Sequence, residues 1–195
     1  MTGPENLTVE MVRRDLAALP VTPLPPGFAF RPFADGDEPT WTGLIRASEH
    51  FFIVRDDLYA GQFGYDPAGA RQRILFVVEE ATGRPVATVA AWYGEERHED
   101  RAGWGRIHWV ATHPEFQGRG LGAAMTTAAL RRLAALGHRN AFLVTSTGRL
   151  PALRLYLRLG FAPDFSRPNA APAWASVAGQ IPAITRYLTG HDKDA

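Results

Sequence analysis

The strongest constraint on this chain is a glycine-rich hexapeptide, Gln-Gly-Arg-Gly-Leu-Gly at residues 117–122. It follows a stretch at 107–112 that is β-branched, aromatic and apolar enough to form a mostly buried strand. After it, apolar residues recur at helical spacing over 125–136, and Gly137 occupies a position that ends a helix. Glycines allow a tight turn, and the first amides of the following helix lack intrahelical partners. The hexapeptide therefore predicts a strand–turn–helix unit that binds an anion such as phosphate or pyrophosphate.

The chain around this hexapeptide is strongly basic. Residues 116–163 contain seven arginines and no Asp or Glu, whereas the whole chain has a formal net charge of +1. A positive field beside an amide-lined turn favours a ligand with several phosphates. Arg119 lies inside the turn and is the arginine that we expect to contact phosphate. Four others are also consistent with ordinary solvated helix faces: Arg131, Arg132, Arg154 and Arg158.

Two other phosphate-binding motifs fit the sequence poorly. Gly118-x-Gly120-x-x-Ala123 loosely fits a dinucleotide fingerprint, but that motif requires an acid about 20 residues further on. The following strand at 141–145 ends without an acid, and the motif lies past the middle of the chain. A P-loop requires Gly-Lys-Ser/Thr, which does not occur. Both nucleotide-binding folds are therefore disfavoured.

Three motifs together resemble the GNAT superfamily of acyl-CoA-dependent N-acetyltransferases. The first is its phosphate-binding motif, Gln/Arg-x-x-Gly-x-Gly/Ala, of which every fixed position is matched. The second leads into the glycine turn, and the third follows at the expected distance. The positions that carry the resemblance are Gln117, Gly120 and Gly122, then Val-x-x-His-Pro-Glu at 110–115, and Leu-Tyr-x-x-x-Gly-Phe at 155–161.

The resemblance implies an α/β (α+β) fold in a single domain, with a mixed, mostly antiparallel sheet flanked by helices. This sheet is splayed between its two central strands, at 107–112 and 141–145, so that acyl-CoA enters between them. We expect an N-terminal helix and Pro-rich linker at 1–27, the acyltransferase core at 28–165, and a C-terminal insert, helix and tail at 166–195 that completes the same domain.

Periodicity and turn residues predict the remaining elements. We expect helices at 1–19, 39–47, 57–62 and 174–180, a strand at 28–33, a hairpin of strands at 74–79 and 85–92 joined by a Thr-Gly turn, a Gly- and Pro-rich turn at 63–70, and an exposed charged loop at 94–105.

The resemblance also implies how the cofactor binds. In this family the glycine turn binds the acyl-CoA pyrophosphate through backbone amides, and the preceding strand pairs with the pantetheine arm. Acetyl-CoA is therefore the expected co-substrate, and no metal is expected. Arg149 occupies the place where many relatives have an asparagine, so its segment is expected to recognise something different. The expected cofactor residues are Val110, Ala111, Thr112, Gln117, Gly118, Arg119, Gly120, Leu121, Gly122 and Ser146, the last also suited to turn capping.

Tyr156, within the third motif, is the first candidate for catalysis. When an amine attacks a thioester, a CoA thiolate leaves, and a nearby phenol can protonate it. The sequence places Tyr156 on a short helix that Pro151 begins and Gly160 ends. The alternative is an ordinary amphipathic tyrosine that packs beside its helical neighbours.

His108 is the second candidate. An amine must lose a proton to attack, and the pKa of histidine, near 6.5, suits that task. His108 resembles a strand histidine of the aralkylamine acetyltransferases that is implicated in deprotonating the amine, while Arg106 replaces the glutamate base of other relatives. Strand alternation predicts that His108 and Val110 share a face and that Trp109 faces the other way. The alternative is a half-buried histidine bonded to a neighbour.

These residues and the resemblance predict an N-acetyltransferase that moves an acetyl group from acetyl-CoA to a primary amine by direct attack in a ternary complex, and a small molecule is the expected acceptor. A catalytically silent acyl-CoA-binding or sensing module is the alternative. A nucleic-acid-binding protein is disfavoured because the chain has no basic arm or recognisable reading motif. The expected acceptor walls are the aromatic residues Phe51, Phe52, Tyr59, Phe63, Tyr65, Trp92 and Tyr93 and the acids Glu95, Glu96, Glu99 and Asp100.

The sequence contains no cysteine, which excludes disulfides, cysteine-ligated zinc and a cysteinyl acyl-enzyme. Its longest apolar runs, such as 74–78 and 86–92, are too short to span a bilayer, and no signal peptide is visible. We therefore expect a cytoplasmic protein with no membrane partner. The tail at 166–195 could cover the acceptor site or pack against a second copy in a homodimer.

Overall fold

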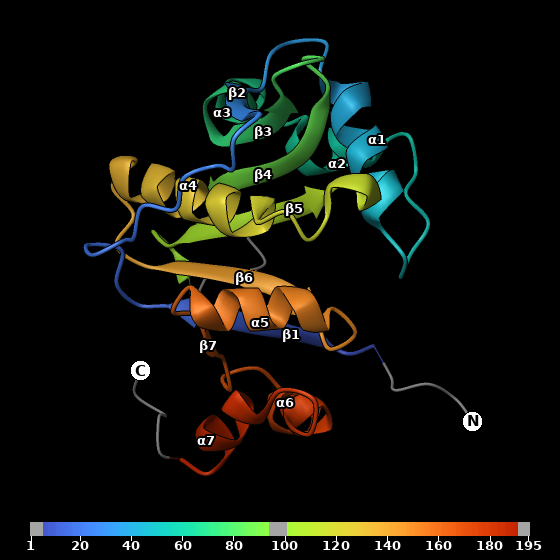
Figure 1. The fold of residues 1–195 in the computed structure, drawn as a ribbon. Helices are drawn as coiled ribbons and strands as arrows, with labels where there is room; N and C mark the ends of the chain where they lie inside the picture. Colours follow the sequence, from blue (N-terminus) through green and yellow to red (C-terminus); the bar gives the residue numbers. More distant parts are fainter. Residues whose placement is uncertain (1–5, 94–100, 191–195) are drawn as a thin grey trace.

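The computed structural model describes residues 6–93 and 101–190. Within these ranges the strands form one seven-stranded sheet, and its order is β2-β3-β4-β5-β6-β1-β7 (Figure 1). The strands are β1 (Thr8–Arg13), β2 (Phe28–Pro32), β3 (Ile74–Glu79), β4 (Pro85–Tyr93), β5 (Gly105–Thr112), β6 (Ala141–Ser146) and β7 (Ala162–Pro163).

Helices cover both faces of this sheet. Figure 1 shows α4 and α5 on the near face, with α6 and α7 beyond β7 at the edge of the molecule. Helix α1 packs on β4 and β5, and α3 packs on β2 and β4. The helices are α1 (Glu38–Ser48), α2 (Leu58–Phe63), α3 (Pro67–Arg73), α4 (Leu121–Ala135), α5 (Leu150–Arg158), α6 (Ala170–Ala178) and α7 (Thr185–Leu188), with short 3-10 turns at Pro114–Phe116 and Pro182–Ile184.

The two faces of the sheet have separate hydrophobic cores. The core under α4 and α5 is mainly aliphatic, and it includes Met125, Leu133 and Leu153. The core under α1 and α2 is aromatic, with Trp41 and Phe63 packed edge to face. Such T-shaped pairs are worth about 0.5–1.5 kcal/mol beyond their burial. The sheet therefore separates two chemically different layers.

The sheet is open at its centre. Every neighbouring pair of strands is antiparallel except β5 and β6, which are parallel. In the part of the chain that the structure describes, β5 and β6 pair only at Gly105–Ala141 and Arg106–Phe142, although both strands continue for several residues. The expected splay between these two strands is confirmed.

The expectation of a helix at 1–19 is wrong for the residues that the structure describes. Residues 8–13 form β1, which lies between β6 and β7. The segment Thr-Val-Glu-Met-Val-Arg is rich in β-branched residues, and Val9 and Met11 alternate into the core. Leu16, whose spacing from Met11 fits one face of a helix, is buried from the segment without regular secondary structure that follows the strand. Sheet pairing therefore prevails over a short-range periodicity.

A β-bulge in β5 overturns a second expectation. Ala90 of β4 lies opposite His108, and Thr88 lies opposite Ala111, so β5 has an extra residue at this point. The backbone accommodates this extra residue at Trp109, which has a φ of +48°. Bulky residues seldom occupy this backbone region. As a result His108 and Trp109 both contact the aromatic core, while Val110 packs against the aliphatic core. His108 and Val110 therefore do not share a face.

Two further boundaries differ from expectation. The turn expected at 63–70 contains the start of α3, because Asp66 caps the helix by accepting from Gly69 N–H at 2.8 Å and Pro67 fits its first turn. Helix α6 begins at Ala170, earlier than the expected 174. Its Trp174 is fully buried, and Trp174 Nε1 donates to the carbonyl of Asp164 at 3.2 Å. Helix α6 thus belongs to the same hydrophobic core as α4 and α5.

A glycine at the start of β5 fixes how closely α4 approaches the sheet. A Cβ at Gly105 would lie 2.7 Å from both methyl carbons of Leu133, which is completely buried. We expect Gly105→Ala to destabilise the fold by about 1–3 kcal/mol through overpacking. In this size class that loss lowers the melting temperature by roughly 2–10 °C.

The matched control is Gly43→Ala on the exposed face of α1, where a Cβ would meet nothing within 4 Å. It should raise stability by up to about 1 kcal/mol, because alanine is the better helix former. Urea unfolding of both variants measures the difference. Equal stability of the two would show that the close approach of α4 does not constrain Gly105.

Candidate functional site

The glycine turn has the geometry that its sequence predicts. Gly118 and Gly120 have φ values of +76° and +84°, which favour glycine. Gly120 is the N-cap of α4 and provides no side-chain cap, so the first amides of the helix remain available to an anion. Gln117 Nε2 donates to the carbonyl of Thr112 at 3.1 Å and ties the turn to the end of β5.

The turn also lies beside α5. A Cβ at Gly122 would approach Leu155 Cδ2 to 3.3 Å, which is tighter than most side-chain contacts. A small residue at this position therefore lets the first turn of α4 pack closely against the helix that carries Tyr156. The first and third sequence motifs meet at this contact.

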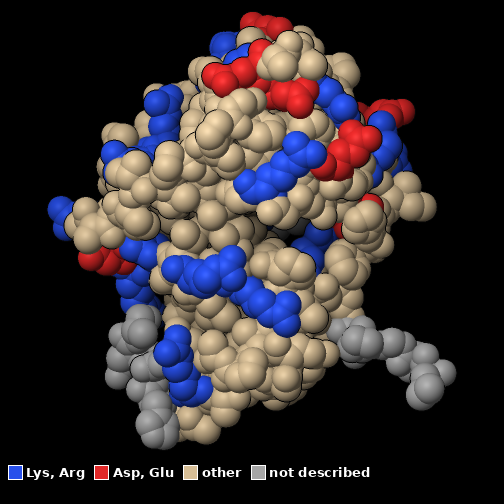
Figure 2. Space-filling view, viewed as in Figure 1, with Lys and Arg blue, Asp and Glu red and all other residues tan. Residues whose placement is uncertain are grey.

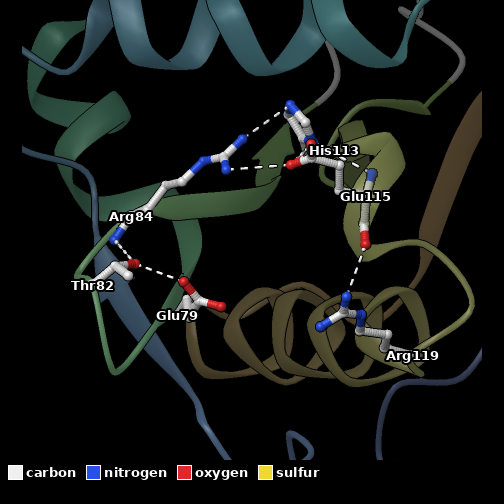
Figure 3. A network of polar contacts seen from close by, with 6 residues as sticks. All are labelled: Glu79, Thr82, Arg84, His113, Glu115 and Arg119. Carbon is white, nitrogen blue, oxygen red and sulfur yellow. Dashed lines mark hydrogen bonds and ion pairs between the residues drawn. The ribbon is translucent and has the colours of Figure 1, made fainter.

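A polar network holds the segment that leads into the turn (Figure 3). Arg84, from the β3–β4 hairpin, contacts His113 Nε2 at 3.1 Å through Nη2 and Glu115 Oε2 at 3.3 Å through Nη1. On the other side, Arg119 Nη2 donates to the carbonyl of Glu115 at 3.0 Å. The guanidinium groups of Arg84 and Arg119 also lie over the Phe116 ring, at 5.5 and 4.8 Å. No feature of the sequence indicates that Arg84 takes part in this network.

The N-terminal linker passes over the same turn. Thr22 accepts a hydrogen bond from Thr127 of α4 at 3.3 Å, between the two Oγ1 atoms. Pro25 Cγ would lie 3.9 Å from a Cβ at Gly120. The sequence predicts a Pro-rich linker here, but nothing in its composition indicates that it borders the glycine turn.

The open edge between β5 and β6 has unmet hydrogen-bonding capacity. Beyond Arg106 the edge of β5 that faces β6 has no strand partner among the described residues, and this edge includes Val110, Ala111 and Thr112. Ser146 Oγ, at the end of β6, is buried and has no hydrogen-bond partner in the described part of the chain. An amide-rich arm such as pantetheine would satisfy such groups. Figure 2 shows a hollow in the middle of the molecular surface seen in this view, with basic side chains at the edge of the hollow.

Tyr156 lies on the inner side of α5. It is 6% exposed, and its ring packs edge to face on Phe161 at 5.9 Å. Burial raises the pKa of Tyr156 to about 12, and the nearby positive charge of Arg149 acts in the opposite direction. The phenol is therefore protonated at neutral pH and can donate a proton.

Arg149 connects the two sides of the opening. Its Nη2 donates to Glu49 Oε2 at 2.7 Å, and its guanidinium lies 4.8 Å from the centre of the Phe51 ring. The other oxygen of Glu49 accepts from the backbone amides of His50 and Phe51. The loop after α1 is thereby fixed to the loop between β6 and α5. In the sequence Arg149 stands out as a departure from the family pattern, but nothing in the sequence identifies Glu49 as its partner.

His108 lies on the opposite side of the sheet from Tyr156. It is 8% exposed, and its ring packs against Phe63 and Trp109 at centroid distances of 5.8 and 5.5 Å. Its Nε2 lies 3.2 Å from Gln62 Oε1, and the same oxygen accepts from Trp109 Nε1 at 3.0 Å. Gln62 is the last polar residue of α2, and no feature of the sequence linked it to His108.

The expected acceptor walls divide into two groups. Three of the aromatic residues, Tyr59, Phe63 and Trp92, are buried in the aromatic core and do not line a surface. Phe51 and Phe52 are each 45% exposed, and the Phe52 ring lies 6.1 Å from that of Trp109. Tyr65 is also exposed, and it accepts from Trp92 Nε1. Tyr93 donates to Asp66. The acids Glu95, Glu96, Glu99 and Asp100 lie outside the described residues.

A separate surface cavity of about 660 Å³ lies beside α3 and Tyr93. Tyr93 pairs with Gly105, at the end of β5 opposite to the glycine turn, so this cavity is not part of the opening. No group of three or more acidic or histidine side chains in the described ranges could hold a metal ion. None of the helices in those ranges is both long and apolar enough to cross a membrane.

The sheet order, the splay and the glycine turn agree with a comparison against protein families. Residues 29–161 match the acetyltransferase (GNAT) family model. The chain belongs to the GNAT family. Acetyl-CoA is the co-substrate of that family.

Among relatives of this GNAT chain, a mycothiol acetyltransferase of Pseudarthrobacter chlorophenolicus is 35% identical over 154 residues, which are 74% of this chain and 46% of the relative. One from Actinosynnema mirum is 31% identical over 163 residues, covering 78% and 50%. The chain therefore spans about half the length of the curated relatives that it matches.

Solved structures confirm the fold. A GCN5-related N-acetyltransferase from Sphaerobacter thermophilus superimposes with a TM-score of 0.69 at 22% identity, over 83% of this chain and 49% of the other.

Proposed function

We propose that this GNAT domain transfers an acetyl group from acetyl-CoA to a primary amine of a small molecule, by direct attack in a ternary complex. One observation carries the proposal: the sheet opens beside an uncapped glycine turn, with Tyr156 on one face and His108 on the other. A thioester that lies in the opening can be reached from both faces. The relatives named mycothiol acetyltransferase support a small-molecule acceptor.

The described geometry supports a set of cofactor contacts. The amides of Gly118 to Gly122 would bind the pyrophosphate, and Arg119 and Gln117 border them. The open edge at Val110, Ala111 and Thr112 would pair with pantetheine. The Ser146 hydroxyl, which has no hydrogen-bond partner among the described residues, would bond to the pantetheine amides. These contacts would account for the unmet hydrogen-bonding groups on both sides of the opening.

The chemical step needs two proton transfers. The amine nitrogen attacks the thioester carbonyl carbon, and His108 takes the proton that the nitrogen loses. The carbon–sulfur bond breaks, and the sulfur receives a proton from the Tyr156 hydroxyl. The products are an amide and free CoA. Direct transfer fits a chain without cysteine, because no thiol is present to form an acyl-enzyme.

A test must separate catalysis from a silent acyl-CoA-binding module. We expect acetyl-CoA, and not NADH or ATP, to raise the melting temperature. At about 100 times its Kd the ligand should stabilise the fold by about 2.7 kcal/mol. A panel of primary amines is then assayed for release of free CoA thiol. Stabilisation with no thiol release for any amine would favour the silent module, and no stabilisation would contradict the cofactor assignment.

A further inference from the structure

Gln62 lies where it can control which nitrogen of His108 carries a proton. Its side-chain oxygen meets two groups from neighbouring residues of β5, His108 Nε2 at 3.2 Å and Trp109 Nε1 at 3.0 Å. The two are brought to one face by the bulge, because a regular strand would turn them apart. We propose that Gln62 is a positioning residue that holds the proton of neutral His108 on Nε2 and so leaves Nδ1 as the base.

The indole of Trp109 determines how the side-chain amide of Gln62 is oriented. An indole N–H can only donate, so the Gln62 atom that faces it must be the oxygen. The same oxygen faces His108 Nε2, and two acceptors would gain nothing from this contact. Nε2 therefore carries the hydrogen and donates. In a neutral imidazole the other nitrogen, Nδ1, then holds the lone pair.

The environment makes this arrangement rigid. Gln62 is followed by Phe63, which is fully buried and packs on Trp41, Trp92 and His108. The end of α2 is thus fixed relative to β5. Because Trp109 is also held against Trp41, at a centroid distance of 5.5 Å, the oxygen of Gln62 lies between two fixed donors. Rotation of the imidazole would break the bond to Gln62.

This inference rests on the proposed acetyl transfer, because only there does the choice of nitrogen matter to function. A base must present its lone pair to the amine in a fixed direction. If the proton could occupy either nitrogen of His108, a fraction of the enzyme would have its lone pair on Nε2, facing Gln62. In that fraction the lone pair could not accept a proton from the amine. Gln62 would therefore raise turnover without contacting acetyl-CoA.

The experiment uses the free protein and three variants. Gln62→Leu removes the acceptor at similar size, Gln62→Glu keeps an acceptor in the same place, and Trp109→Phe removes the other donor while leaving the amide. The ¹⁵N chemical shifts of the His108 ring, recorded in protein with ¹⁵N-labelled histidine at a pH where the ring is neutral, report the position of the proton without any turnover.

We expect the Nε2–H form to predominate in the unchanged protein and in Gln62→Glu. The two forms should mix in Gln62→Leu, which has no acceptor, and in Trp109→Phe, in which the side-chain amide of Gln62 is free to turn its NH2 group toward His108. Turnover of Gln62→Leu should fall about tenfold or more with an unchanged KM for acetyl-CoA, and Gln62→Glu should restore part of it. Melting temperatures show whether each variant is folded.

Two results would overturn the proposal. One is an Nδ1–H form in the unchanged protein. The other is a Gln62→Leu variant that keeps the Nε2–H form or loses no turnover. Failure of the proposed function is a separate result: no amine is acetylated by the unchanged protein, while the ring spectra still show whether Gln62 sets the position of the proton.

Discussion

Gly120→Asp is expected to abolish measurable acetyl-CoA binding. Gly120 is the N-cap of α4 with a φ of +84°, and its neighbouring amides would face the pyrophosphate. A carboxylate about 5 Å from a phosphate charge costs about 3 kcal/mol at an effective dielectric constant of about 20. That energy corresponds to a loss of affinity of at least about a hundredfold. Isothermal titration calorimetry with acetyl-CoA measures the Kd directly.

Gly120→Asn is the matched control for this change. Asparagine has nearly the same shape as aspartate and tolerates the left-handed backbone, but it carries no charge. We expect it to lose much less affinity than Gly120→Asp. An equal loss in both variants would mean that side-chain bulk beside Pro25, and not charge, blocks the turn. Unchanged affinity in the aspartate variant would refute the phosphate-binding role.

Tyr156→Phe is expected to lower turnover by about 10²–10⁴-fold while leaving acetyl-CoA affinity nearly unchanged. The ring would still fill its place against Phe161, so the fold should persist and only the proton donor is lost. The measurement is steady-state release of free CoA thiol at saturating amine. Tyr187→Phe removes the hydroxyl of another buried tyrosine, on α7, and should leave turnover unchanged.

The pKa of Tyr156 gives the same variant a second readout. Burial raises this pKa to about 12, above the value of about 10 in the unfolded chain. The neutral phenol therefore contributes stability that is fully present below pH 10 and is lost as the pH rises toward 12. Tyr156→Phe should lose less stability over this interval than the unchanged protein. A loss of activity already near pH 9–10 that disappears in the phenylalanine variant would contradict a buried neutral phenol.

The sequence alone was sufficient to predict the features that depend on local backbone conformation and residue spacing. The glycine turn, helix α4 and the end of that helix at Gly137 follow from backbone freedom and spacing, and the structure confirms them. The splay followed from the family resemblance, and the limited pairing of β5 with β6 confirms it. The roles of Tyr156, His108 and the cofactor residues stay predictions.

Features that depend on distant pairing could not be predicted. The segment 8–13 has apolar spacing that fits either a helix or a strand, and only its partners β6 and β7 decide between them. The bulge at Trp109 adds one residue whose signal is absent from a pattern of alternating side chains. Gln62 meets His108 across 46 positions of sequence, and nothing local marks a glutamine for that contact.

The position of β1 has a consequence for how the domain is made. Leu7 N–H donates to Thr147 Oγ1 across 140 positions of sequence, and β1 fills the gap between β6 and β7. During synthesis on the ribosome β1 emerges long before either neighbour, so it has no sheet partner until β6, which ends at residue 146, has been added. The sheet can close only after almost the whole domain has emerged. A nascent chain stalled after β6 but before β7 would present β1 as an exposed edge, a surface that chaperones or other nascent chains can bind.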